Sequence, residues 1–430
     1  YNTGNDGFAY NDRFNHSTWL TFMKNRLEIA KEFLREDGVI FVQIDYIEFG
    51  YLKILMDEIF GVNKSLPCIS VKTATPAGFK VINPGPVNVT EFILVYSKGD
   101  RKNALNNLFT ATGYQKDYSQ YIVNFEKDIS EWQSESLKSA VLKKLGYTTD
   151  KEIFNDLGKE FSLNLLTKEI QDFALENSEK VFATFGPHKP TSKVKNTMLD
   201  SKKNPDKFYK IEKNDGGFHY MKNGRLLAFY SNKIKEIDGK KVVSQRLTDF
   251  WSDLSWDGIG GEGKVTLKNG KKPEALIKRI IELSTAPGEI VLDFHLGSGT
   301  TAAVAHKTRR QYIGIEQLEY SEHSSKIRLQ NVINSDKSGI SKIIDWKGGG
   351  DFIYFELAEY NEEAKNKIDA CTSFKELKKL FTELTEYYFL NYNVSVKQFN
   401  DQLLDDKDFE ELPLEEQKTL FKALLDNNQL

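Results

Sequence analysis

Two glycines and one acid carry the clearest chemical signal in this sequence. Gly297 and Gly299 stand in the run Asp-Phe-His-Leu-Gly-Ser-Gly-Thr-Thr-Ala at residues 293–302, and Glu316 follows. Glycines let a backbone approach a ligand closely, and the start of a following helix offers unpaired N–H groups. An acid about 20 residues further on, at the end of the next strand, can bind both hydroxyls of a ribose. This spacing predicts a site for a ligand that contains a nucleoside.

The glycine loop by itself fits more than one class of ligand. Gly297-x-Gly299-x-x-Ala302 matches the dinucleotide fingerprint in its alanine variant, and it fits the glycine loop of S-adenosylmethionine enzymes equally well. It is not the phosphate loop of an NTPase, because no lysine follows the glycines. The remaining alternative is a tight strand-to-helix turn without a ligand, and the position of Glu316 argues against it.

The elements that must position these residues can be read from the flanking sequence. The apolar run 290–292 predicts a buried strand, and a helix is expected to begin at Thr301. Residues 311–315 predict a second strand, which ends at Glu316. Helices are expected from 272 to about 284 and from Glu316 to about 331.

A second stretch of alternating helices and strands occupies the first hundred residues. Apolar residues at helical spacing predict a helix to about residue 35 with Ser17 as its N-cap. A nearly all-apolar strand at 39–44, a helix at 47–59 and a strand at 91–96 follow. Asp45 either lines a pocket or caps the next helix. The alternation predicts a doubly wound α/β sheet.

The region between these stretches, residues 102–250, has a different character. It is expected to mix short helical segments with polar loops. Residues 189–249 hold 15 Lys or Arg and 7 Asp or Glu, and aromatic residues interleave with lysines at 207–210 and 218–220. Cations for phosphates and rings for bases are typical of a nucleic-acid surface. An ordinary solvated face is the alternative.

Composition limits the possible classes of protein. With 430 residues, 40% hydrophobic and 28% charged, the chain is expected to form a soluble protein of two or three domains. Cys68 and Cys371 are the only cysteines, which excludes a disulfide framework and a cysteine zinc site and suits the cytoplasm. No apolar run reaches the roughly 18 residues of a membrane span. The chain does not begin with Met, so we expect it to be part of a longer protein.

Several motifs in one order resemble a known family. The chain resembles the modification subunit of bacterial type III restriction–modification systems, which are adenine-N6 DNA methyltransferases of the circularly permuted β-type. The similar stretches are Tyr-Asn-Thr-Gly at 1–4, which looks like the end of the family's Asp-Pro-Pro-Tyr-Asn-Thr-Gly, then 10–14, 41–45, 91–98, 269–281, 293–301 and the triple glycine at 348–350 with a short strand predicted at 352–355.

The resemblance implies methyl transfer from S-adenosylmethionine to adenine N6 in duplex DNA, with the base flipped out of the stack. Tyr1 would be the catalytic-site residue that stacks on the flipped adenine. Gly297 and Gly299 would admit the methionine part of the cofactor, and Glu316 would hold its ribose. The other implied cofactor-binding residues are Lys272, Pro273, Asp293, Phe294, His295, Ser298 and Thr300. No metal is implied.

The resemblance also implies an organisation and partners. We expect the catalytic half of a methyltransferase domain at 1–100, an inserted target-recognition domain at 101–254, the cofactor half at 255–346 and an assembly domain at 347–430. The sheet would be built from two separate stretches, and the C-terminal domain would be helical. Expected partners are duplex DNA, a second copy of the chain and a restriction (helicase–nuclease) subunit, without a membrane.

Two departures from the family pattern leave alternatives open. His295 stands where the family has the phenylalanine of Phe-x-Gly-x-Gly, and the acid and prolines expected before Tyr1 are not in this chain. A non-catalytic DNA-recognition subunit or truncated fragment and an N4-cytosine methyltransferase are therefore alternatives. A nicotinamide dehydrogenase would use the same glycine loop, but it predicts no basic inserted domain.

Overall fold

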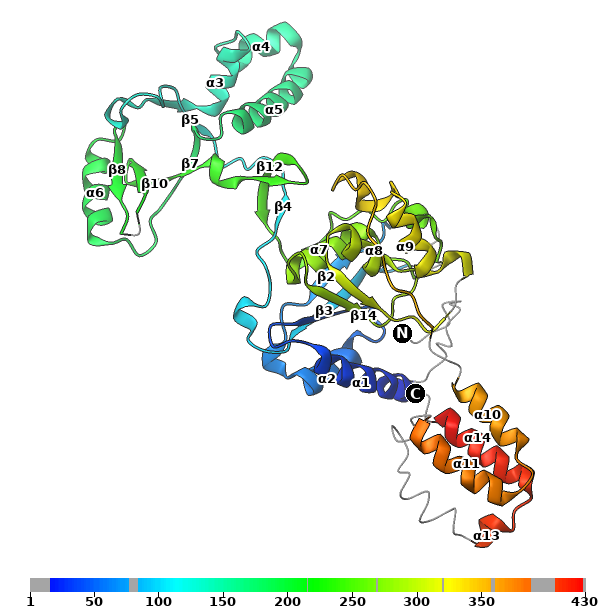
Figure 1. The fold of residues 1–430 in the computed structure, drawn as a ribbon. Helices are drawn as coiled ribbons and strands as arrows, with labels where there is room; N and C mark the ends of the chain where they lie inside the picture. The colour runs from blue at the N-terminus through cyan, green and yellow to red at the C-terminus, as the bar shows by residue number, and fades with distance from the viewer. Residues whose placement is uncertain are drawn as a thin grey trace.

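The computed structural model describes residues 16–76, 84–214, 216–267, 270–318, 321–356, 360–387 and 407–427. An α/β body occupies the centre, a β-rich region projects from it, and a bundle of helices lies apart on the other side (Figure 1). We call residues 16–97 the first α/β stretch and 258–356 the second α/β stretch. Residues 101–254 are the inserted region, and 360–427 the C-terminal bundle.

The first α/β stretch contains α1 (His16–Phe33), β1 (Val39–Ile44), α2 (Phe49–Phe60), β2 (Ile69–Lys72) and β3 (Thr90–Ser97). Its sheet has the order β1-β3-β2-β13, with β13 (Phe250–Trp251) contributed from the end of the inserted region. β3 runs antiparallel to both β1 and β2, and β13 is parallel to β2. The predicted helices and strands are confirmed, although α1 begins one residue before Ser17, which is therefore not its N-cap.

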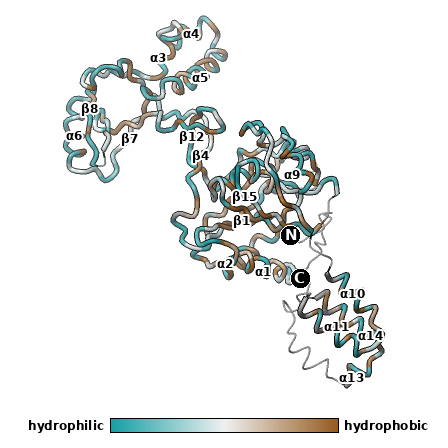
Figure 2. The backbone as a smooth tube through the Cα atoms, in the orientation of Figure 1, coloured by the Kyte–Doolittle hydropathy of each residue, from teal (hydrophilic) through white to brown (hydrophobic). Residues whose placement is uncertain are grey.

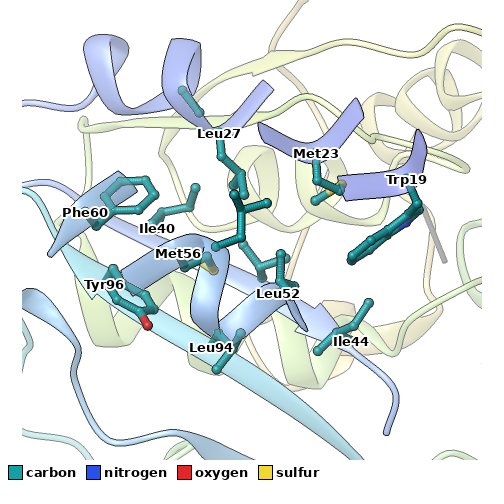
Figure 3. Close-up of a cluster of buried hydrophobic side chains, with 13 residues drawn as sticks. Trp19, Met23, Leu27, Ile40, Ile44, Leu52, Met56, Phe60, Leu94 and Tyr96 are labelled. Atoms are coloured by element: carbon teal, nitrogen blue, oxygen red, sulfur yellow. The ribbon is translucent and has the colours of Figure 1, made fainter. Parts of the chain in front are cut away.

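The core of this stretch forms because α1 and α2 each present one apolar face. Trp19, Met23 and Leu27 recur at intervals of four residues, so they share a face of α1. They pack with Leu52 and Met56 of α2 above the strands (Figure 3). All five side chains are buried. This packing fixes β1, and with it the carboxyl edge of the sheet at which Asp45 lies.

The inserted region combines short strands with helices. One sheet has the order β6-β5-β7-β10-β9-β8, and a second has the order β11-β12-β4. Helices α3, α4, α5 and α6 accompany them (Figure 1). The bounds are β4 (Phe109–Ala111), β5 (Gln120–Ile122), β6 (Ser134–Ser136), α3 (Leu137–Lys144), α4 (Asp150–Leu157), α5 (Lys159–Glu176), β7 (Val181–Phe185), α6 (Ser192–Lys203), β8 (Phe208–Glu212), β9 (Phe218–Lys222), β10 (Arg225–Phe229), β11 (Ile234–Ile237) and β12 (Lys240–Arg246). The expectation of helices and loops missed these strands.

The second α/β stretch contains α7 (Glu274–Ser284), β14 (Ile290–Asp293), α8 (Thr300–Lys307), β15 (Gln311–Gly314) and α9 (Ser325–Ile333). β14 and β15 are parallel, as predicted. Within the described residues they pair with each other and not with the sheet of the first stretch. The two stretches nevertheless pack together, since Phe294 lies against the α1 core and Arg35 pairs with Glu289 at 2.7 Å. The α/β fold class with a helical C-terminus is confirmed.

The C-terminal bundle has its own core. It contains α10 (Tyr360–Ala370), α11 (Phe374–Tyr387), α13 (Lys407–Glu410) and α14 (Leu414–Asn427). Hydrophobic and hydrophilic residues alternate along its helices (Figure 2), and Ile368, Phe381 and Phe421 meet inside it. Among the helices that the structure describes, none is both long and apolar enough to cross a lipid bilayer.

The strand predicted at 352–355 is wrong. These residues form no ladder with another strand, although Ile353 and Phe355 favour strands. Phe352 packs instead with Leu296 and Leu329 of the second α/β stretch. The segment therefore belongs to the packing of that stretch and not to the C-terminal bundle.

Candidate functional site: a glycine loop and two carboxylates at one sheet edge

The carboxyl ends of β14 and β15 bring two acids to the same edge. Asp293 is the last residue of β14 and pairs in register with Gly314 of β15, two residues before Glu316. The backbone pairing continues beyond the strands, because the N–H of Ile315 donates to the carbonyl of Asp293 at 2.9 Å and the N–H of Leu296 to that of Ile315 at 3.0 Å. Parallel α/β sheets bind ligands at this edge.

The loop between β14 and α8 requires glycine at both glycine positions of the motif. Gly297 and Gly299 have φ values of +55° and +79°, which side chains rarely adopt. A Cβ on Gly299 would also lie 2.8 Å from that of Ser325. The loop can therefore lie close to its surroundings only without side chains, and α8 begins directly after it at Thr300.

The Glu316 carboxylate ties this loop to the end of β15. Its Oε2 accepts the N–H of Gly297 at 2.6 Å, and its Oε1 accepts the N–H groups of Gln317 and Leu318, both at 2.9 Å. Two carboxylate oxygens can accept about four hydrogen bonds. The half-buried carboxylate thus retains the capacity to accept a hydrogen bond from a ligand hydroxyl.

The surroundings of Asp293 and His295 shift the pKa values of these two side chains in opposite directions. Burial raises the pKa of the Asp293 carboxyl, opposed by hydrogen bonds from the Thr301 side chain and the N–H of His295. Burial lowers the pKa of His295 to about 3, so its ring is neutral at physiological pH. The ring centroid of His295 lies 6.1 Å from that of Phe22 and 5.0 Å from that of Phe294. A neutral ring among aromatic neighbours can take the place of an aromatic residue in a pocket wall.

Comparison with known proteins decides the family. A family model described as DNA methylase matches residues 1–326, about three quarters of the chain. The chain belongs to the DNA methylase family. Residues 297–302 of this methylase contain no lysine or arginine for phosphates, and the neighbouring acid suits a ribose, so the observed site fits a nucleoside cofactor such as S-adenosylmethionine.

Comparison with individual proteins shows which kinds of DNA methylase this chain is similar to. The methylase is 42% identical to the probable type III restriction-modification enzyme HindVI Mod subunit of Haemophilus influenzae, over 100% of this chain and 59% of that protein. It is 27% identical to the EcoP15I Mod subunit of Escherichia coli, over 76% of this chain and 55% of that one. The type II methyltransferase M.KpnI of Klebsiella pneumoniae is 26% identical, over 80% and 78% of the two chains. The methylase thus spans less than two thirds of the Mod subunits.

The hydroxyls of Ser298 and Thr300 point to Arg328 in the methylase. Nη1 of Arg328 lies 2.8 Å from Oγ1 of Thr300 and 3.5 Å from Oγ of Ser298, and all three side chains are buried. Both hydroxyl residues were predicted from the sequence to bind cofactor, whereas Arg328 was not singled out. No pattern marks this residue among the 59 lysines and arginines of the chain.

Lys272 joins the two α/β stretches near the start of α7, which Pro273 precedes. Its Nζ lies 2.8 Å from Oε2 of Glu91 on β3, and the same oxygen accepts a hydrogen bond from the Gln43 side chain at 2.6 Å. The ammonium also lies 5.6 Å from the centre of the Trp256 ring. Lys272 was predicted from the sequence as a site residue, whereas Glu91 and Gln43 were missed.

The sequence also pointed to Tyr1, to residues 10–14 and to Asp45. Tyr1 and residues 10–14 lie outside the described part of the chain. The Asp45 carboxylate accepts a hydrogen bond from the N–H of Ile47 at 2.9 Å. This contact lies in the turn that precedes α2. In the described residues there is no group of three or more His, Cys, Asp or Glu side chains that could hold a metal ion.

Proposed function

We propose that this chain forms part of a site-specific DNA methyltransferase, the modification subunit of a type III restriction–modification system. It would transfer a methyl group from S-adenosylmethionine to N6 of adenine in duplex DNA. The observation that carries the proposal is the glycine loop tied to Glu316, in a chain 42% identical along its whole length to a type III Mod subunit. A bacterial DNA substrate would place the activity in the cytoplasm.

The residues at the sheet edge have distinct proposed roles toward the cofactor. Gly297 and Gly299 leave room for the methionine part, and Glu316 accepts a hydrogen bond from the ribose. The cofactor pocket would be lined by Asp293, Phe294, His295, Lys272 and Pro273, with Ser298 and Thr300 shaping the loop. When bound, S-adenosylmethionine supplies a methyl group that its own sulfonium activates.

The charges around this pocket are compatible with a cationic ligand. His295 is neutral because burial lowers its pKa to about 3. The ammonium of Lys272 is neutralised by Glu91 at 2.8 Å. Neither side chain therefore repels a sulfonium. Tyr1, by its match to the family motif, would stack on the flipped adenine, and the Asp and a proline carbonyl of that motif would hold the amine of the adenine.

The function is tested by methyl transfer from labelled S-adenosylmethionine to duplex DNA. We would join this chain to the parts of the HindVI Mod subunit outside the matched region, with Asp-Pro-Pro placed directly before Tyr1. The chimera should label adenine N6, and changing that Asp to Ala should abolish the label. Label on cytosine N4, or none in a folded chimera that binds DNA, would overturn the proposal.

The inserted region would bind DNA through only part of its surface. Residues 150–179, which include α4 and α5, contain 8 acids and 3 bases, whereas 189–249 contain 15 bases and 7 acids. Lys202, Lys203 and Lys207 are exposed at the end of α6 and just before β8. The opposite charges of these parts support a phosphate-binding face on the side of α6.

Changing Lys202, Lys203 and Lys207 together to Gln should weaken binding to duplex DNA of any sequence. For every phosphate that a lysine no longer neutralises, the slope of log affinity against log salt should fall by about one unit. Fluorescence anisotropy over a salt series measures both quantities. The matched control changes the exposed Lys151, Lys159 and Lys168 to Gln, with the same loss of charge. Equal effects of the two triple variants would contradict the assignment.

We also propose that the C-terminal bundle serves assembly, either with a second copy or with a restriction subunit. It has a core of its own, and the residues that precede it, Phe352 and Tyr354, contact the second α/β stretch. Truncation after Glu356 should therefore change the sedimentation coefficient beyond the loss of mass while affinity for S-adenosylmethionine stays within about twofold. A folded truncated chain that no longer binds the cofactor would contradict this division.

A further inference from the structure

Helix α9 packs against the glycine loop. Ser325, its first residue, occupies the space that a side chain on Gly299 would need. One turn later, the guanidinium of Arg328 reaches the loop and donates to Thr300 at 2.8 Å, with Ser298 at 3.5 Å. The side chain of Arg328 is fully buried. A buried, charged side chain therefore holds the start of α8 in place.

The same guanidinium is held on its other side by α7. Nη2 of Arg328 lies 2.8 Å from Oε1 of Glu274, which is also fully buried. Glu274 directly follows Lys272 and Pro273, the proposed opposite side of the cofactor pocket. Lys307 shares the Glu274 carboxylate at 2.8 Å, which fixes that carboxylate further. Arg328 thus connects the glycine loop with the start of α7, which are the two proposed sides of the cofactor pocket.

The chain returning from the inserted region closes over Arg328. Gly263 lies so near that a Cβ there would be 2.6 Å from Nε of Arg328. The N–H of Gly263 donates to Ser338 at 2.6 Å, and its carbonyl accepts from Asn331 at 3.0 Å. Gly263 has a φ of +65°, which suits glycine. The guanidinium is therefore enclosed by protein, with its side chain fully buried.

We propose that Arg328 is a positioning residue for the cofactor. Its fork sets the 297–300 loop at a fixed distance from Lys272 and Pro273, through Thr300 on one side and Glu274 on the other. Lysine cannot make both contacts, because its single ammonium lacks the planar fork of arginine. The inference rests on the proposed function, since it takes S-adenosylmethionine as the ligand of the loop.

The experiment compares cofactor affinity among variants of the full chain by calorimetric titration with S-adenosylmethionine. Arg328→Met should weaken binding about tenfold or more, and Arg328→Lys should restore only part of the loss. A matched pair isolates the contact with the loop: Thr300→Val removes the hydroxyl and should weaken binding about fivefold, whereas Thr300→Ser keeps it and should recover most of that loss. DNA affinity should stay unchanged in all four.

A purely structural role predicts a different result. It would lower the unfolding temperature of these variants while the folded chain bound cofactor with its original affinity. In the active chimera, positioning should raise KM for S-adenosylmethionine more than it lowers kcat. Unchanged affinity and KM in folded Thr300→Val and Arg328→Met would overturn the inference alone. If the parent chain bound no S-adenosylmethionine, the proposed function and this inference would fail together.

Discussion

Replacing Lys307 by methionine should lower the stability of the second α/β stretch by about 3–5 kcal/mol. Lys307 lies at the end of α8 with its side chain fully buried, 2.8 Å from Glu274 and 3.3 Å from Asp336. Methionine keeps the length and the apolar stem but removes the ammonium. Glu274 would keep its ion pair with Arg328 at 2.8 Å, whereas Asp336 would lose its ion pair with the ammonium. An uncompensated buried charge is among the most destabilising changes that a single substitution can make.

The loss should depend on pH. Burial alone would raise the pKa of Asp336, but the Ser338 hydroxyl and the charge of Lys307 hold that pKa below its ordinary value of 3.8. In the parent chain Asp336 therefore contributes stability above pH 3.8 and loses it as the pH falls through the folded pKa. Without Lys307 the folded pKa rises, so the deficit of the variant should be largest at neutral pH and shrink toward about pH 4.

Chemical unfolding at pH 7 and pH 4.5 measures this difference, and hydrogen exchange of the α8 amides assigns it to the second α/β stretch. The control is Lys347→Met, because Lys347 is exposed and its ammonium pairs with the exposed Asp345. That variant should change stability by no more than about 0.5 kcal/mol. A loss of similar size in both variants, or one independent of pH, would show that the buried charges do not account for it.

The elements around the glycine loop could be predicted because their signals are local. Gly297 and Gly299 need positive φ values, and the apolar runs that flank them form β14 and β15. The stripe of Trp19, Met23 and Leu27 likewise identifies α1 without any knowledge of its partners. In each of these elements the pattern lies within a few consecutive residues.

The strands of the inserted region could not be predicted in the same way. β5 has three residues, too few to show an alternation, and it pairs with β7 about sixty residues later in the chain. Such a strand exists because distant partners complete its hydrogen bonds. The segment 352–355 shows the converse, since it has strand-forming residues but no ladder beside it.

The buried charges of the site were missed for a related reason. A sequence assigns Glu274, Lys307 and Arg328 to the surface, because charged residues are almost never fully buried unless they are paired. Their pairing unites α7, α8 and α9, and no single helix carries a sign of it. The place of Glu316 after β15 could be predicted, and its role as a ribose ligand stays a prediction, whereas its three backbone partners could not be foreseen.

Replacing Glu316 by alanine should weaken binding of S-adenosylmethionine about ten- to a hundredfold, equivalent to roughly 1.5–3 kcal/mol. Alanine removes the charged carboxylate that would accept a hydrogen bond from a ribose hydroxyl. The control is Glu322→Ala, which removes an exposed carboxylate near the end of the same loop region and should leave affinity unchanged. Calorimetric titration of the two variants and the parent chain provides the comparison.

The carboxylate also holds the N–H of Gly297 at 2.6 Å, so part of any loss could come from the loop and not from the ribose. Titration with S-adenosylhomocysteine and with its 2′,3′-dideoxyribose analogue separates the two contributions. If Glu316 binds the hydroxyls, the alanine variant should lose about ten- to a hundredfold for the ribose ligand and only a few-fold for the analogue. Equal losses for both ligands would mean that Glu316 acts through Gly297 alone, and unchanged affinity for both would remove it from the site.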